Sequence, residues 1–160
     1  MRASLNPSDL LDLDRIVVSL RTGLGDRLVS IVLFGSKARR DEHPDSDWDL
    51  LVIARELPEH RLERLFSMKE MLPDQLRSRV SLLAKTPEEF ESSLPALYLD
   101  IALDGIVQYD PRGYAREKIR LLRNIINRKG LKRNRTGRDF FWQWDEFPGF
   151  GWSLEWEGSD

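Results

Sequence analysis

The sequence predicts an α/β fold, or an α+β fold, with a small mixed sheet. Segments with helical spacing of apolar residues alternate along the chain with short runs of β-branched and apolar residues. The 160 residues, of which 41% are hydrophobic, suit one domain with a small appendage. These two observations define the fold class before any motif is considered.

Four segments carry apolar residues at three- and four-residue intervals, which predicts helices. These segments are 9–24, 58–71, 94–104 and 111–130. Ser8 precedes the first helix and is expected to cap it. Four shorter runs predict strands, and they are 28–34, 48–54, 79–84 and 106–109. A short helix is expected at 37–40, directly after the first strand.

The C-terminal part of the chain differs in character from the rest. A basic amphipathic helix is predicted over 111–130, and aromatic runs follow at 140–144 and 151–156. Their partly alternating pattern predicts an aromatic β-hairpin with 145–150 as its loop. We therefore divide the chain into a domain over residues 1–110 and an extension over residues 111–160.

The net charge of −2 hides an uneven distribution of charge. Residues 112–138 hold eleven Lys and Arg residues and one acid, Glu117, whereas the remainder holds 14 basic and 26 acidic residues. A basic arm of this kind binds an anionic partner such as RNA, or it lies against the acidic body of its own chain. The sequence leaves both interpretations open.

Composition excludes or disfavours several kinds of site. The chain has no Cys, which excludes disulfides, thiolate metal sites and a cysteine nucleophile. His43 and His60 stand in polar surroundings without a His/Cys cluster, so we expect no zinc site. No apolar run approaches the roughly 20 residues of a membrane-spanning helix, and no signal peptide is evident. We expect a cytoplasmic protein without membrane association.

The most informative segment joins the first two predicted strands. Gly35-Ser36 follows the first strand, and a turn there can direct backbone N–H groups at one point, which suits phosphate. After ten further residues come Asp47 and Asp49. Strand periodicity places these two carboxylates on one face and Trp48 on the other.

Two adjacent carboxylates repel each other unless a cation lies between them. Mg²⁺ takes hard oxygen ligands and typically binds one or two carboxylates together with substrate phosphates. Lys37 and Arg39 add positive charge beside the turn. The segment therefore predicts a site for a magnesium-bound nucleotide.

The spacing Gly-Ser-x10-Asp-x-Asp, here Gly35-Ser36 and Asp47-Trp48-Asp49, resembles the motif of minimal nucleotidyltransferases (MNT) of the polymerase-β-like superfamily. Further residues of the extended motif are present, namely Ala38, Arg39, Ser46 and Leu50. The resemblance extends over about residues 9–109. It implies a nucleotidyltransferase fold with a small mixed sheet, helices packed mainly on one side, and Mg²⁺-dependent transfer of a nucleoside monophosphate.

The resemblance also implies roles for individual residues. The residues expected to bind the nucleoside triphosphate are Gly35, Ser36, Lys37 and Arg39. The expected catalytic residues, which would also ligate Mg²⁺, are Asp47 and Asp49. In active members a third carboxylate on a later strand completes a two-metal arrangement and acts as base on the acceptor hydroxyl.

This sequence departs from the family at the third carboxylate. Ser81 occupies the expected place, and a neutral hydroxyl cannot replace a carboxylate as base or as a strong metal ligand. Asp100 or Asp104 would reach the site only if the helix over 94–104 runs beside it. Three interpretations stay open: a transferase with reduced metal binding, one completed by its substrate or partner, and a degenerate domain that still binds nucleotide.

The resemblance further implies a partner protein. MNT proteins often work with a HEPN-type protein, a ribonuclease toxin, and as antitoxins they transfer AMP from ATP to a toxin tyrosine. The alternative is a non-catalytic module that neutralises the toxin by contact. The extension over 111–160 then offers a surface for such a partner or for a homo-oligomer, or it covers a sheet edge. The acceptor is not fixed by the sequence.

Overall fold

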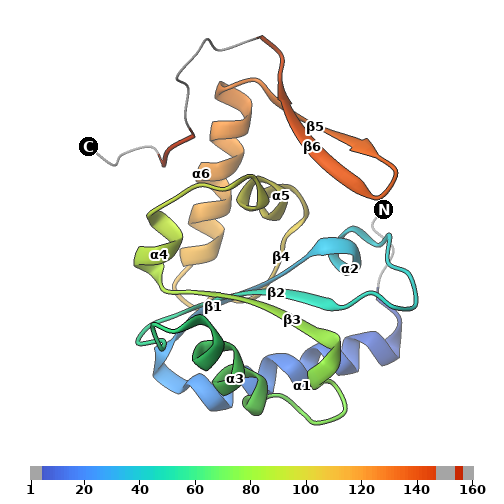
Figure 1. Cartoon of the computed structure of the whole chain (residues 1–160), viewed down its shortest axis with the longest axis vertical. Helices are drawn as coiled ribbons and strands as arrows, with labels where there is room; N and C mark the ends of the chain where they lie inside the picture. The colour runs from blue at the N-terminus through green and yellow to red at the C-terminus, as the bar shows by residue number, and fades with distance from the viewer. Residues whose placement is uncertain (1–4, 147–153, 157–160) are drawn as a thin grey trace.

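The computed structural model describes residues 5–146 and 154–156. A four-stranded mixed sheet with the strand order β3-β2-β1-β4 lies at its centre (Figure 1). The strands are β1 (Leu28–Phe34), β2 (Trp48–Ala54), β3 (Val80–Lys85) and β4 (Ile106–Tyr109). β1 pairs antiparallel with β2 and β4, whereas β2 and β3 are parallel. The four predicted strands and the mixed sheet are confirmed.

The structure has six α-helices among the described residues, and five of them correspond to the predicted helices with small shifts at their ends. The six helices are α1 (Pro7–Leu24), α2 (Gly35–Arg39), α3 (Arg61–Met71), α4 (Pro87–Glu91), α5 (Ala96–Asp104) and α6 (Tyr114–Arg128). Asn6, and not Ser8, caps α1, because its side chain accepts a 2.8 Å hydrogen bond from the backbone N–H of Asp9. No helix in the described part of the chain is long and apolar enough to cross a bilayer.

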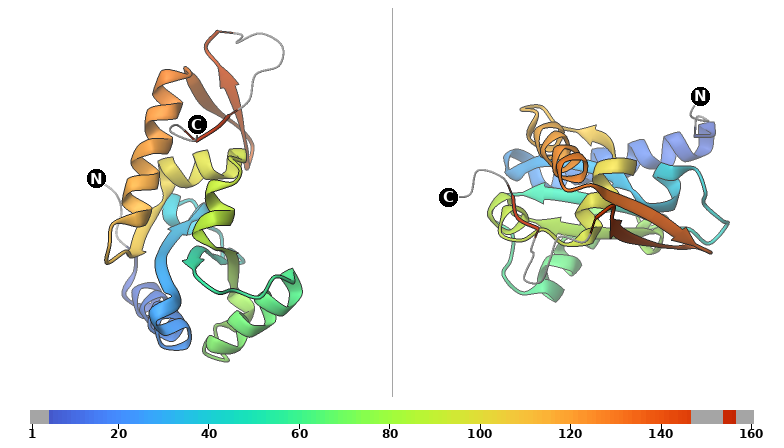
Figure 2. Two further views of the ribbon diagram at one scale, coloured as in Figure 1. Left: turned by 90° about the vertical axis from the view of Figure 1, so that its left-hand side faces the viewer. Right: turned by 90° about the horizontal axis from the view of Figure 1, so that it is seen from above.

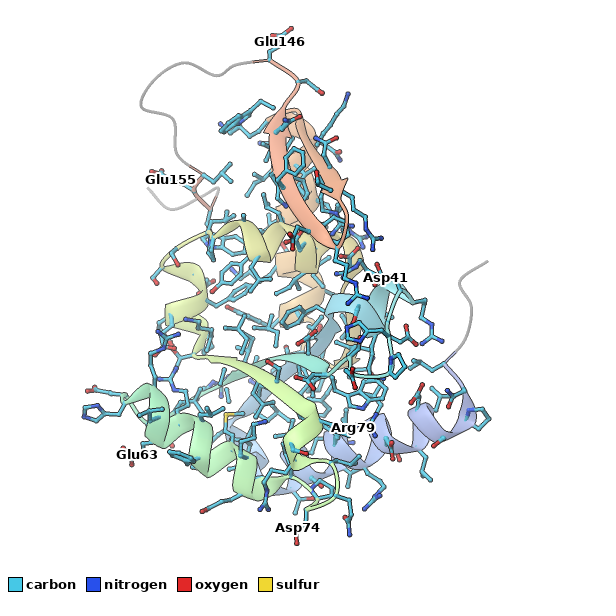
Figure 3. All side chains as sticks on the ribbon, turned by 45° about the vertical axis from the view of Figure 1, so that its right-hand side comes forward. Asp41, Glu63, Asp74, Arg79, Glu146 and Glu155 are labelled. Atoms are coloured by element: carbon cyan, nitrogen blue, oxygen red, sulfur yellow. The ribbon has the colours of Figure 1, made fainter. Side chains whose placement is uncertain are left out.

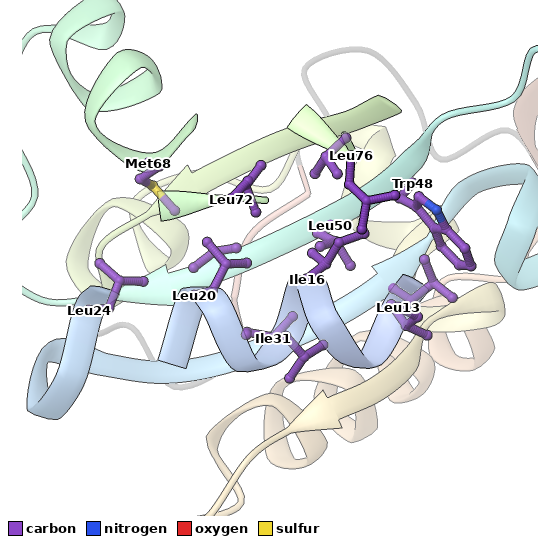
Figure 4. Close-up of a cluster of buried hydrophobic side chains, with 14 of the residues drawn as sticks. Leu13, Ile16, Leu20, Leu24, Ile31, Trp48, Leu50, Met68, Leu72 and Leu76 are labelled. Carbon is purple, nitrogen blue, oxygen red and sulfur yellow. The ribbon is translucent and has the colours of Figure 1, made fainter. Parts of the chain in front are cut away.

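Each face of the sheet packs against its own layer of helices. Trp48 and Leu50 of β2 lie in a core with α1 and α3 (Figure 4), whereas Leu51 and Ile53 lie in a second core with α4, α5 and α6. Figure 2 shows the sheet between these two layers. The expectation that helices pack mainly on one side is therefore wrong, because α4, α5 and the helix of the extension cover the second face.

The predicted hairpin forms with a different partner strand. β5 (Leu131–Thr136) pairs antiparallel with β6 (Asp139–Trp144), so the aromatic run over 140–144 pairs with the basic segment after α6. Gly137, with φ of 64°, lies in the turn between them. Of the expected partner run, 151–153 lies outside the described residues and 154–156 forms no strand. The hairpin returns toward α2 (Figure 1).

Ion pairs hold the basic extension against the acidic body. Figure 3 shows Asp41 directly beneath the tip of the hairpin. The pairs are Lys118–Glu91, Arg133–Asp100, Arg133–Asp104 and Arg135–Asp41. Of the two interpretations of the basic arm, these contacts favour the intramolecular one.

Asp110 joins the domain to the extension. Its side chain is 1% exposed and accepts hydrogen bonds from Ser30 Oγ at 2.7 Å and from the backbone N–H groups of Ala115 and Arg116 at 3.0 Å each. Burial raises the pKa of this carboxyl, but the hydrogen bonds outweigh burial and the pKa is lowered. The first turn of α6 is thereby fixed to β1.

Asp110→Ala is expected to lower the free energy of unfolding by about 2–4 kcal/mol, because buried donors lose their acceptor. Because the pKa is lowered in the folded state, this stabilisation is present at neutral pH and is lost as the pH falls below the ordinary value of 3.8. Chemical denaturation across this pH range measures it. Asp139→Ala, at an exposed site, is the control and is expected to change stability by less than about 0.5 kcal/mol. Equal losses in the two variants would contradict the role of Asp110.

Candidate active site

The turn after β1 lies directly against the carboxylate of Asp49. Phe34, the last residue of β1, pairs with Asp49 across the antiparallel ladder. Gly35 follows with φ of 74°, and a Cβ atom at this position would lie 2.1 Å from Asp49 Oδ2. Glycine fits here because it lacks a side chain and adopts positive φ without strain. The two parts of the motif therefore converge in space, as the sequence predicts.

The surroundings of Asp49 disfavour the charged form of its carboxyl group. Trp48 is fully buried on the α1 side, which leaves Asp49 on the opposite face of β2, and Asp47 stands exposed just before the strand. Burial, and then the charge of Asp47, raise the pKa of Asp49 from 3.8 to about 6, while the charge of Arg39 opposes this rise. The charges of Asp47 and Asp49 therefore act on each other, and the charge of Arg39 partly offsets this.

A tight turn fixes the loop that carries Asp47. The backbone N–H of His43 donates to Ser46 Oγ at 3.0 Å, and the backbone N–H of Ser46 donates to the His43 carbonyl at 2.9 Å. The Nδ1 atom of His43 accepts a 3.2 Å hydrogen bond from the backbone of Asp45. The serine of the extended motif therefore acts by shaping the loop, and His43 takes part in the same turn.

Ser81 stands where the third carboxylate is expected. It lies opposite Asp49 in the parallel register of β2 and β3, and its side chain is exposed. Asp100 and Asp104 do not replace the missing acid, because both pair with Arg133, at 3.2 and 2.6 Å. Across residues 5–146 and 154–156, no three His, Asp or Glu side chains are grouped so as to hold a metal ion.

Arg39 lies on the carboxylate side of α2. Its guanidinium is 3.2 Å from Asp41 and 3.6 Å from Asp104. Its charge also lowers the pKa of Asp49, against the effects of burial and Asp47. The charge of Arg39 therefore acts on Asp49, while its guanidinium pairs with Asp41 and Asp104.

Lys37, by contrast, points to the other side of the sheet. Its side chain is buried, with the ammonium 4.3 Å from the centroid of the Trp48 ring and 4.0 Å from Asp9 of α1. Contacts of this kind stabilise a buried ammonium through the π-electrons of the ring and the opposite charge. The placement does not support Lys37 as a phosphate ligand, and it indicates a role in packing α2 against α1.

Lys69 of α3 is a cation near the site that sequence reasoning missed. Its ammonium donates to the backbone carbonyls of Arg77, at 3.0 Å, and Val80. Burial lowers the pKa of Lys69, and the charge of Asp47 partly offsets this. A lysine on a helix stripe carries no sequence signal for such a contact, because the partner atoms belong to the backbone before and at the start of β3.

The family described as "Polymerase beta, Nucleotidyltransferase" matches residues 25–94. The matched segment contains the Gly35 turn, Asp47 and Asp49. Residues 25–94 are therefore similar to a nucleotidyltransferase domain of the polymerase β type. This segment is the nucleotidyltransferase part of the chain.

One relative and two solved structures are similar to this chain. "Putative protein adenylyltransferase MJ1305" from Methanocaldococcus jannaschii is 29% identical over 120 residues, which are 72% of this chain and 82% of the relative. A crystal structure of a toxin–antitoxin complex with AMP-PNP aligns with a TM-score of 0.50 and 19% identity over 71% of this chain and 90% of that one. A Shewanella oneidensis complex of a tri-AMPylated HEPN toxin with an MNT antitoxin gives 0.49 and 19%, over 75% and 91%. The nucleotidyltransferase fold implied by the motif is confirmed.

Asp49→Asn is expected to raise the stability of the metal-free nucleotidyltransferase at pH 7. Because the folded state raises the pKa of Asp49 from 3.8 to about 6, ionisation destabilises the fold as the pH rises between these values. A neutral amide of the same shape removes this penalty, which is about 1–3 kcal/mol. Thermal unfolding at pH 4 and pH 7 measures it. The difference is expected to be small at pH 4, and a variant less stable than wild type at pH 7 would contradict the electrostatic account.

Gly35→Ala tests the contact between the turn and the carboxylate. The added methyl group would displace Asp49, so the variant is expected to lose metal-dependent nucleotide binding as well as stability. Gly113→Ala is the matched control, because Gly113 has φ of 73° and a Cβ atom there would meet nothing within 4 Å, which leaves only the backbone strain of about 1 kcal/mol. Isothermal titration with AMP-PNP and Mg²⁺ compares the two. Equal binding in both variants would show that the contact has no functional role.

Proposed function

We propose that this nucleotidyltransferase moves AMP from ATP to a hydroxyl group of a protein, with Mg²⁺ as cofactor. The observation that carries the proposal is the contact between the Gly35 turn and Asp49, which joins a phosphate-binding turn to a carboxylate pair. Two comparisons support the nucleotide and the acceptor class. A relative is named for protein adenylyltransferase activity, and a structure with the same fold was crystallised with AMP-PNP.

The residues present suit a hard cation. Asp47 and Asp49 offer carboxylate oxygens, and their mutual repulsion contributes to the raised pKa of Asp49. When bound, Mg²⁺ would be held by these two residues and would supply positive charge to the triphosphate oxygens. Gly35 and Ser36 would contact the phosphates through their backbone N–H groups, and Arg39 would add a guanidinium on the same side.

In the proposed step, the acceptor hydroxyl oxygen attacks the α-phosphorus of ATP. A new O–P bond forms while the bond from the α-phosphorus to the oxygen that bridges to the β-phosphate breaks, and pyrophosphate leaves with that oxygen. The hydroxyl proton passes to solvent or to a base on the acceptor. Asp47 and Asp49 stay ionised throughout and keep the triphosphate in place.

Ser81 at the third acid position bears on the choice of acceptor. Without a carboxylate there, a hydroxyl that ionises readily needs less help from the enzyme, and a tyrosine hydroxyl has a pKa of about 10, far below that of serine. A tyrosine is therefore the acceptor that we propose. We propose that a HEPN-type toxin carries this tyrosine, since one chain of a crystallised toxin–antitoxin complex has a similar fold.

Incubation with α-labelled ATP, Mg²⁺ and a purified HEPN-type protein as acceptor tests the proposal. Labelled acceptor is expected with the wild type, and Asp47→Asn is expected to reduce the rate by at least about 100-fold, because one metal ligand is lost. Asp139→Asn, at an exposed acid of β6, serves as the control and is expected to keep full activity. Labelling that is unchanged in Asp47→Asn would rule out this mechanism.

Ser81 favours a second candidate function, a module that binds its partner without catalysis. Ser81→Asp restores a carboxylate opposite Asp49 and separates the two candidates. If the wild type is inactive and Ser81→Asp gains Mg²⁺-dependent transfer, the chain is a lapsed enzyme that acts by contact. Wild-type labelling that depends on Asp47 would exclude this alternative.

A further inference from the structure

We infer that the β5–β6 hairpin is part of the nucleotide site, with Phe140 and Arg133 positioning the guanidinium of Arg39. The inference rests on the proposed function, in which Arg39 contacts the triphosphate. The family match ends at residue 94, so neither hairpin residue belongs to the matched segment. The site of this chain is therefore built from the domain and from its extension together.

Three guanidinium groups surround the ring of Phe140. The Cζ atoms of Arg39, Arg133 and Arg135 lie 4.7, 4.4 and 5.3 Å from the ring centroid, all within the range of cation–π attraction. Arg39 comes from α2, whereas the other two come from β5 (Figure 1). The Phe140 ring is thus the point where the extension meets the helix of the motif.

Asp104 connects Arg39 to Arg133 through its carboxylate. Its side chain is 9% exposed, accepts two hydrogen bonds from Arg133 at 2.6 and 2.8 Å, and lies 3.6 Å from Nη1 of Arg39. The two-point contact fixes the plane of the Arg133 guanidinium. A long side chain such as Arg39 samples many rotamers when unsupported, and the ring and the carboxylate together restrict it.

Arg39 and the turn proposed to hold the triphosphate lie at opposite ends of the short helix α2. A cavity of about 400 Å³ lies between α2 and the hairpin, lined by residues that include Arg39, Arg133, Arg135 and Phe140. Because α2 spans only the five residues from Gly35 to Arg39, its ends are about 6 Å apart along the helix axis. The cavity therefore lies at the C-terminal end of α2, one short helix away from the turn at Gly35.

Phe141 provides a matched control for Phe140. It is the next residue of β6, so its side chain points to the opposite face of the hairpin, where it is 41% exposed. Phe140→Leu and Phe141→Leu remove the same aromatic ring from the same strand. Only the first removes the ring that contacts Arg39.

Isothermal titration with AMP-PNP and Mg²⁺ measures the effect on nucleotide binding. Phe140→Leu is expected to weaken binding about tenfold, and Phe140→Tyr, which keeps an aromatic ring, is expected to stay within about twofold of wild type. Phe141→Leu is expected to bind as wild type does. Thermal unfolding verifies that each variant is folded. If Phe140→Leu does not fold, Asp104→Asn takes its place, since it keeps the side-chain shape and removes the charge next to Arg39.

A double-mutant cycle with Arg39→Gln decides whether Phe140 acts through Arg39. If it does, adding Phe140→Leu to Arg39→Gln causes little further loss of affinity, whereas independent effects multiply. Multiplied losses, or equal affinities of Phe140→Leu and Phe141→Leu, would overturn the inference. A wild type that does not bind AMP-PNP would instead refute the proposed function, so the two failures are distinguishable.

Discussion

The structure around the site depends on the close contact between the backbone at Gly35 and the carboxylate of Asp49. The register of β1 and β2 sets Phe34 opposite Asp49, so the chain leaves β1 at the point where this side chain projects. A residue with a Cβ atom would collide with the carboxylate, and the positive φ at Gly35 turns the chain into α2. The same closeness buries Asp49 beside Asp47 and raises its pKa. A carboxyl group held at such a cost in stability is typical of a site prepared for a ligand.

The extension is structurally continuous with the domain rather than attached to it by a linker. Leu122 and Ile125 of α6 share a core with Leu51 and Ile53 of β2, and the buried Asp110 fixes the start of α6. The hairpin that follows reaches α2 through its arginines. A nucleotidyltransferase domain of the polymerase β type is thus completed on its second face by residues outside the matched segment.

The sequence predicted what local patterns encode. The four strands, their order along the chain and the Gly35–Asp49 convergence follow from periodicity and from the Gly-Ser and Asp-x-Asp spacing. The pairing of β6 with β5 was not predictable, because the basic run over 131–136 alternates too weakly to indicate a strand. The burial of Lys37 against Trp48, and the placement of Arg39 by residues of the distant hairpin, depend on tertiary packing. No local signal in the motif shows that Lys37 and Arg39 have these different surroundings.

The backbone amide signals of Gly35, Ser36 and Asp49 in a nitrogen-15 NMR spectrum test the central claim most directly. AMP-PNP and Mg²⁺ together are expected to shift all three signals with one common affinity, and either component alone is expected to shift them far less. Signals at Gly35 and Ser36 that do not respond, or that respond equally without Mg²⁺, would contradict a shared site for metal and triphosphate.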